Sequence, residues 1–215
     1  MRRTLNLIAA ICTILCAALP TFATAGVGTS GGGHVVVCTG RSADALGYVT
    51  LLDLYEAQRV LNLTLRASRV SLEAELELLA NQLQVVFGSL NGVAQPISAD
   101  SLLEWWESRV QYIPGLRTHT SDFGEVPALP VGCALEQIAV YDDKHDVLQV
   151  NMNLWDSLDD FNKAALIAHE IIYRERRLTD RESSSQISRF LVGRIFSTLE
   201  LSDSRTMLVD YRQNH

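Results

Sequence analysis

The sequence lacks any apolar run as long as the roughly 20 residues that a membrane-spanning helix needs. Its longest apolar stretch, Leu7 to Leu19, follows Arg2 and Arg3 and is soon followed by Ala23-Thr24-Ala25. A basic start, a short apolar stretch and a small-residue cleavage site are typical of a secretory signal peptide. We therefore predict that residues 1–25 are a signal peptide and that the mature protein is periplasmic or secreted, with no stable membrane anchor.

Positive charge is also scarce. The chain has 18 Lys and Arg against 25 Asp and Glu, and two of the basic residues but none of the acidic ones lie in residues 1–25. The predicted mature chain of 190 residues therefore carries a formal charge of −9. This balance disfavours a nucleic-acid or anionic-membrane partner. A chain of this length is typical of a single domain, which we place at residues 34–215.

Residues 26–33 are mostly glycine. A nucleotide-binding loop is one interpretation of such a segment, but no strand precedes it and no Gly-Lys-Ser/Thr follows it. Glycine-rich segments of this kind are usually flexible linkers. We predict that residues 26–33 form a flexible leader.

Cysteine is rare, and no C-x-x-C pair exists, which disfavours redox catalysis. Cys12 and Cys16 lie in the predicted signal peptide, so only Cys38 and Cys133 remain in the mature protein. An oxidising compartment favours joining two such cysteines. We predict a Cys38–Cys133 disulfide that closes a loop of about 95 residues.

Four β-prone segments occur in two pairs. Residues 34–38 and 48–52 form the first pair, and residues 135–141 and 147–152 flank the polar turn Asp142 to Asp146. Each pair predicts a hairpin, and a Cys38–Cys133 bond places the hairpins side by side in one sheet.

Apolar residues at helical spacing predict five helices. Three lie near residues 53–66, 71–87 and 100–110. The fourth starts at Ser157, a predicted N-cap with an acid three residues on, and the fifth at a predicted capping box in residues 179–182. Together with a long connection over residues 114–132, these elements predict an α+β fold, with a small mixed or antiparallel sheet from two hairpins packed with about five helices.

The fourth helix contains Ala168-His169-Glu170-Ile171-Ile172-Tyr173-Arg174. With the strand and turn before it, this segment resembles the active-site helix of gluzincin-type metallopeptidases. In those enzymes H-E-x-x-H supplies two zinc ligands and a catalytic glutamate. The resemblance implies His169 as a metal ligand and Glu170 as the catalytic base, with Glu182 as a candidate distant ligand. Tyr173 stands where the second histidine of the motif is expected.

A structural interpretation of the same residues competes with a catalytic one. Glu170 and Arg174 stand at i and i+4 in the favoured order for an ion pair, and His169 lies one turn from Tyr173. The sequence contains no G-x-S-x-G segment, so a serine nucleophile of that type is disfavoured.

Five further segments stand out along the chain. They are Gly-Gly-Gly-His-Val-Val-Val-Cys (31–38), Leu-Leu-Asp-Leu-Tyr-Glu-Ala (51–57), Gly-Cys-Ala-Leu-Glu-Gln-Ile-Ala (132–139), Leu-Trp-Asp-Ser-Leu (154–158) and Ala-His-Glu-Ile-Ile-Tyr-Arg-Glu (168–175). Together they resemble an uncharacterised family of exported proteins of predatory Gram-negative bacteria. The resemblance implies a shared fold with a cysteine in each hairpin and a His-Glu-x-x-Tyr-Arg helix as a signature, and it implies no reaction.

The same resemblance extends to Ser185 and Arg189, four residues apart in the last predicted helix. We hypothesise that Arg189, Glu170 and Tyr173 meet in a buried polar network between the last two predicted helices.

Two functional hypotheses follow. The first is a non-catalytic periplasmic or secreted domain whose zincin-like helix is degenerate, with no cofactor and with Tyr173, Arg174, Ser185 and Arg189 as polar network residues. The second is a zinc-dependent, peptidase-like hydrolase with an atypical ligand set around His169 and with Glu170 as the catalytic base.

Overall fold

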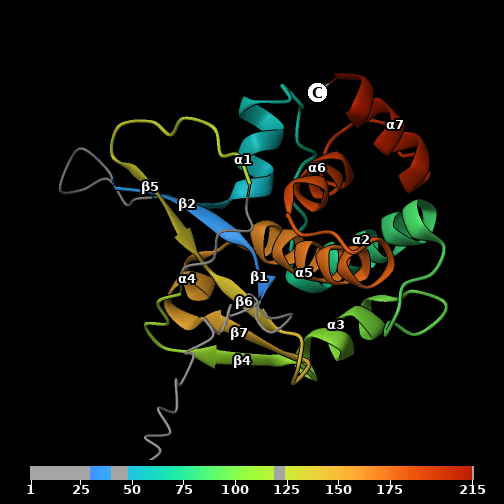
Figure 1. Ribbon diagram of the computed structural model, residues 1–215, viewed down its shortest axis with the longest axis horizontal. Coiled ribbons are helices and arrows are strands. Elements are labelled where there is room, and N and C mark those ends of the chain that lie inside the picture. The colour runs from blue at the N-terminus through green and yellow to red at the C-terminus, as the bar shows by residue number, and fades with distance from the viewer. Residues whose placement is uncertain (1–29, 40–47, 119–123, 215) are drawn as a thin grey trace, which may run out of the picture.

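The computed structural model describes residues 30–39, 48–118 and 124–214 of the 215-residue chain. The predicted signal peptide and the first residues of the predicted leader lie outside this part. The predicted α+β class is confirmed, with seven helices and two small sheets in the described residues. Figure 1 shows the sheets on the left and lower side of the molecule and several helices on the right.

The strands are β1 (Ser30–Gly31), β2 (His34–Cys38), β3 (Tyr48–Leu51), β4 (Val110–Ile113), β5 (Cys133–Gln137), β6 (Ala139–Asp142) and β7 (Val147–Asn151). The helices are α1 (Leu52–Arg59), α2 (Leu72–Phe87), α3 (Ala99–Glu107), α4 (Met152–Ser157), α5 (Asp160–Asp180), α6 (Gln186–Ile195) and α7 (Ser204–Asn214).

The seven strands form two sheets instead of the single sheet predicted. One has the order β1-β6-β7-β4, antiparallel except for the parallel pair β4 and β7, and the other has the order β3-β2-β5 and is antiparallel. The predicted pairings of β2 with β3 and of β6 with β7 are confirmed. The prediction of one shared sheet was wrong, because β5 and β6 belong to different sheets.

The predicted strand 135–141 is in fact divided at Ile138, a fully buried residue. The N–H of Ile138 donates to the carbonyl of Gly33, and its own carbonyl accepts from the N–H of Asn151. These two bonds satisfy the backbone at the point where the chain passes from one sheet to the other. The β-prone pattern of these seven residues gives no sign of this change of partner.

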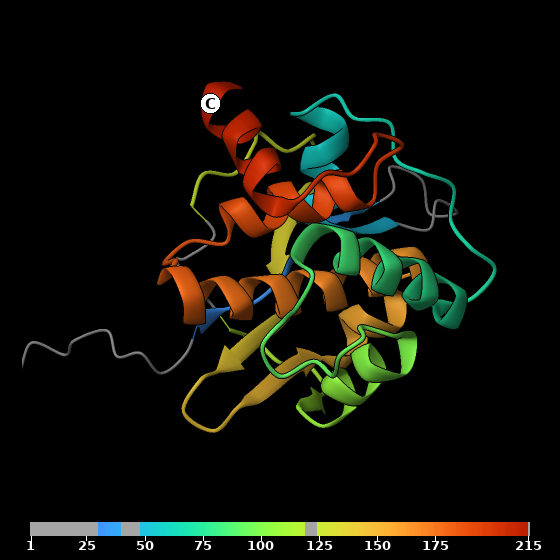
Figure 2. The ribbon, with the colours of Figure 1, turned by 90° about the vertical axis from the view of Figure 1, so that its right-hand side faces the viewer.

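Helix α5 forms the centre of the domain. It packs against α2, α6 and β3, and Figure 2 shows it crossing the middle of the molecule. From Ala164 to Ala168 every residue has 0% exposure. A helical stretch that is apolar on all sides lies in the core, and the next five residues, His169 to Tyr173, are buried with it.

Both predicted caps around α5 were wrong. The N-cap is Asp159, whose side chain accepts from the N–H of Asn162, and not Ser157, which ends α4. The predicted capping box at residues 179–182 lies at the other end of α5. There Arg181 adopts a left-handed conformation (φ 56°), which stops the helix.

Other boundaries also differ from the sequence prediction. Helix α1 ends at Arg59 and not near residue 66, and α3 ends at Glu107, after which the chain forms strand β4. Helix α7 was not predicted at all. By contrast, α2 begins and ends where its pattern indicated, with the Ser71 side chain accepting from the N–H of Ala74 as an N-cap.

The end of the predicted leader is part of the fold. Strand β1 pairs with β6, and the N–H of Gly32 donates to Ala139 O at 3.0 Å. Gly32 and Gly33 are both buried. The prediction of a flexible leader is therefore wrong for residues 30–33, because hydrogen bonds to β6 and α5 hold their backbone in place.

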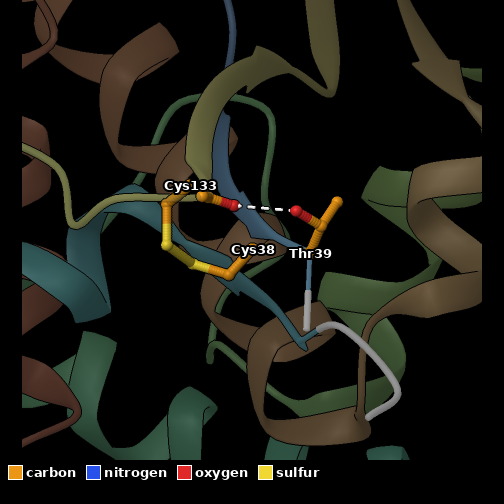
Figure 3. Close-up of a disulfide and its surroundings, with 4 residues drawn as sticks. Cys38, Thr39 and Cys133 are labelled. Carbon is orange, nitrogen blue, oxygen red and sulfur yellow. Dashed lines mark hydrogen bonds between the residues drawn. A yellow bond between two sulfur atoms is a disulfide. The ribbon is translucent and has the colours of Figure 1, made fainter. Parts of the chain in front are cut away.

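The predicted disulfide is present. Cys38 and Cys133 are bonded across the antiparallel pair β2 and β5 (Figure 3). Beyond it, Thr39 Oγ1 donates to Gly132 O at 3.2 Å, and the Thr39 N–H donates to the same carbonyl at 2.9 Å. The bond thus ties the two strands of the smaller sheet together at one end.

Candidate functional site

The His-Glu pair of α5 is inside the protein. His169 and Glu170 are each 1% exposed. The central position of α5 turns both side chains toward other parts of the core, His169 toward α1 and Glu170 toward the segment before β2. Each is held by a specific polar partner.

His169 is paired with Asp53 of α1. Its Nδ1 lies 2.7 Å from Asp53 Oδ2, and the Asp53 side chain is 0% exposed. Burial lowers the pKa of His169, but the Asp53 and Glu170 carboxylates together raise it, so the pKa lies above its ordinary value. Among the described residues, neither His169 Nε2 nor Asp53 Oδ1 has a hydrogen-bond partner. The pair is therefore a buried ion pair with one polar atom unused on each side.

Glu170 is bound by the glycine pair before β2. Its Oε1 accepts from the Gly33 N–H at 2.6 Å. A Cβ on Gly32 would lie 2.6 Å from both Glu170 Oε1 and Ala139 O, so no larger residue fits at that position without a shift. Burial raises the pKa of Glu170, although His169, the Gly33 N–H and Arg177 act in the opposite direction. The pKa of Glu170 therefore lies above its ordinary value, because burial penalises the charged form.

We expect Glu170→Gln to leave the free energy of unfolding unchanged or to increase it. The amide oxygen still accepts from Gly33, and the cost of burying a charge disappears. Glu170→Ala should instead cost about 1–3 kcal/mol, because the Gly33 N–H loses its partner. Urea unfolding of both variants, with the exposed Glu77→Gln as a control, tests this. A large loss in Glu170→Gln would show that the charge itself is required.

The neighbouring residues of the motif divide between two sides of α5. The Tyr173 ring is 1% exposed and lies 5.9 Å from the His169 ring, which confirms the expected contact between these two side chains. Arg174 instead reaches the turn between β6 and β7, where its Nη2 lies 3.0 Å from Asp146 Oδ1. The expected pairing of Arg174 with Glu170 is therefore replaced by one with Asp146.

Arg189 of α6 is paired with a second carboxylate of α1. Its Nε donates to Glu56 Oε2 at 2.7 Å, Nη1 to Ser185 Oγ at 3.1 Å and Nη2 to Glu125 O at 2.8 Å. The expected proximity of Ser185 and Arg189 is borne out. The expected meeting of Arg189 with Glu170 is not, because Glu170 is bound to Gly33 and Glu56 takes the arginine.

Sequence reasoning missed Asp53 and Glu56. They stand three residues apart on α1 and are therefore neighbours on its surface. Asp53 contacts His169 of α5, and Glu56 contacts Arg189 of α6. Figure 1 shows α1 and α6 next to each other above α5. The one available signal was an acid between leucines in Leu-Leu-Asp-Leu, since a charge within an apolar segment of a buried helix needs a partner.

A cavity of about 230 Å³ lies beside the Glu56–Arg189 pair. Its lining comes from α1, α6, α7 and the segment after residue 123, and includes Glu56, Val126, Pro127, Arg189, Phe190 and Tyr211. We call it the Glu56 cavity. It combines an ion pair with apolar and aromatic walls, a combination common in ligand sites.

The side chains around His169 do not fit a catalytic zinc site. Such sites use three protein ligands, and the described residues contain no group of three His, Cys, Asp or Glu side chains placed to hold a metal ion. The Glu170 side chain is bound to Gly33, and the candidate distant ligand Glu182 pairs with Arg176 at 2.7 Å.

Comparisons with protein-family models, curated proteins and solved structures gave no match. Within the described residues, no helix is both long enough and apolar enough to cross a membrane.

Proposed function

We propose that this chain is an exported, non-catalytic binding domain in which the His-Glu helix is architectural. The observation that carries the proposal is the burial of His169 and Glu170, each 1% exposed and each held by a partner from another segment. A catalytic base or metal ligand must reach its substrate or the water that it activates. Side chains enclosed in this way serve instead to fix α5 against α1 and the first strands.

Export is the second part of the proposal. The Cys38–Cys133 disulfide supports it, because disulfides persist mainly in oxidising compartments. The basic and apolar residues at the start of the sequence support it independently. A periplasmic or secreted location agrees with both observations.

The test is the metal content of the purified mature protein, measured by elemental mass spectrometry together with thermal unfolding. We expect no stoichiometric zinc in the wild type and a large fall in Tm for His169→Ala, because Asp53 would then be a buried charge without a partner. His145→Ala is the matched control, since the His145 side chain is 62% exposed. Its Tm should stay near the wild-type value.

The alternative, a metal-dependent hydrolase, has a different expected result. It requires about one zinc per chain in the wild type, retained in His145→Ala and lost in His169→Ala. The unused Nε2 of His169 is the atom that favours this alternative, since Asp53 on Nδ1 resembles the carboxylates that orient metal-binding histidines. Finding that zinc would overturn the non-catalytic proposal.

A further inference from the structure

The walls of the Glu56 cavity are apolar and aromatic. The Phe190 and Tyr211 rings lie 4.8 Å apart and are tilted by 48°. Val126 and Pro127 contribute aliphatic surface from the segment after residue 123. Such walls bind the apolar body of a small ligand, and the faces of aromatic rings also attract cations.

The described lining of the cavity has more acidic than basic residues. It includes two acidic residues, Glu56 and Glu125, and one basic residue, Arg189. Arg189 divides its donors among Glu56 Oε2, Ser185 Oγ and Glu125 O. The Glu56 carboxylate therefore shares its guanidinium partner with two other groups.

The Glu56 carboxylate is also poorly solvated. Its side chain is 15% exposed. Burial raises the pKa of Glu56 above its ordinary value, because the nearby Arg189 offsets the loss of solvent only in part and Asp53 adds a further repulsion. A second positive charge next to this carboxylate would stabilise its ionised form.

We propose that the Glu56 cavity binds a small organic cation, an ammonium group on an aromatic or aliphatic body. The ammonium group pairs with Glu56, and the body packs between the Phe190–Tyr211 rings and Pro127. The proposal rests on the proposed function in one respect: the cavity binds its ligand without a reaction. A neutral ligand gains no charge pairing with Glu56, and an anion is repelled by the excess of carboxylates.

Three probes of nearly the same shape test the charge preference. They are 2-phenylethylamine, 2-phenylethanol and phenylacetate, titrated into the mature protein at pH 7 by isothermal calorimetry. We expect the amine to bind with one-to-one stoichiometry and a Kd of about 1 mM or tighter. The alcohol should bind at least about tenfold more weakly, and phenylacetate more weakly still.

Two variants test the site. Glu56→Gln keeps the shape and an acceptor for Arg189 but removes the charge, so amine affinity should fall about tenfold while alcohol affinity stays unchanged. Tyr211→Leu removes one aromatic wall and should lower amine affinity about threefold to tenfold. Glu104→Gln, an exposed carboxylate on α3, is the matched control for net charge and should bind like the wild type. Thermal unfolding of each variant verifies its fold.

Amide chemical shifts provide a readout that does not depend on any variant. On addition of the amine, shifts should concentrate in α1, residues 124–127, α6 and α7. The proposal is overturned if the amine binds no more tightly than the alcohol, if Glu56→Gln and Glu104→Gln bind alike, or if the shifts lie elsewhere. If the amine does not bind, the metal-free role of the His-Glu helix still stands. If the same sample contains stoichiometric zinc, that role is overturned, but the preference of the cavity for a cation is not.

Discussion

Asp53→Ala should lower the free energy of unfolding by about 3–5 kcal/mol, as expected when one partner of a buried ion pair is removed. Asp53 and His169 are 0% and 1% exposed and lie 2.7 Å apart, so the remaining imidazole loses its hydrogen-bonded counter-ion in a site closed to solvent. Since whole domains are stable by only about 5–15 kcal/mol, this single change should remove a large part of the stability. Urea unfolding with linear extrapolation measures it.

Three further variants separate the ion pair from other effects. Asp53→Asn keeps an acceptor for His169 Nδ1 and should cost less than Asp53→Ala. Asp156→Ala, an exposed acid on α4, should be nearly neutral. In the double variant Asp53→Ala with His169→Ala, the second substitution should cost much less than it does alone. Strictly additive losses would mean that the two side chains do not act as a pair.

Removing the disulfide should have the second large effect on stability. The bond joins residues 95 positions apart, and a loop of that length is worth up to about 4–5 kcal/mol in the chain-entropy account. We therefore expect Cys38→Ala with Cys133→Ala to lose about 2–5 kcal/mol in urea unfolding. The loss should equal that of the wild type under reducing conditions.

The control for this prediction is Val131→Ala, which lies two residues before Cys133 and is 86% exposed. Its free energy of unfolding should equal that of the wild type, both without reductant and with it. A thiol assay on the unfolded, unreduced mature protein should detect no free cysteine. Equal stability of the oxidised and reduced wild type would contradict the expected contribution of the bond.

Much of the fold follows from local sequence pattern. The apolar spacing of residues 71–87 predicts α2 closely, because a helix of that length is specified by its own periodicity. Strand β2 was predicted from its β-branched run, and β7 from a β-prone segment that follows a polar turn. The predicted export to an oxidising compartment and the two cysteines of the mature chain were enough to predict the disulfide.

The short and the buried elements were harder to predict. Strand β4 has four residues, too few to show a period, and it exists because β7 provides a parallel partner. The division of residues 135–141 depends on the bonds that Ile138 makes with Gly33 and Asn151. Partners so distant in sequence leave no local signal.

The sequence by itself determined the class of the fold, the disulfide and the position of the His-Glu helix, because composition, cysteine count and helical periodicity are properties of the chain alone. Only the tertiary structure decided that His169 pairs with Asp53 and that Glu56, not Glu170, pairs with Arg189. These pairings depend on which faces of the helices pack against one another. A buried charge is stable only beside a suitable partner, and distance in sequence does not reveal which partner the packing brings near.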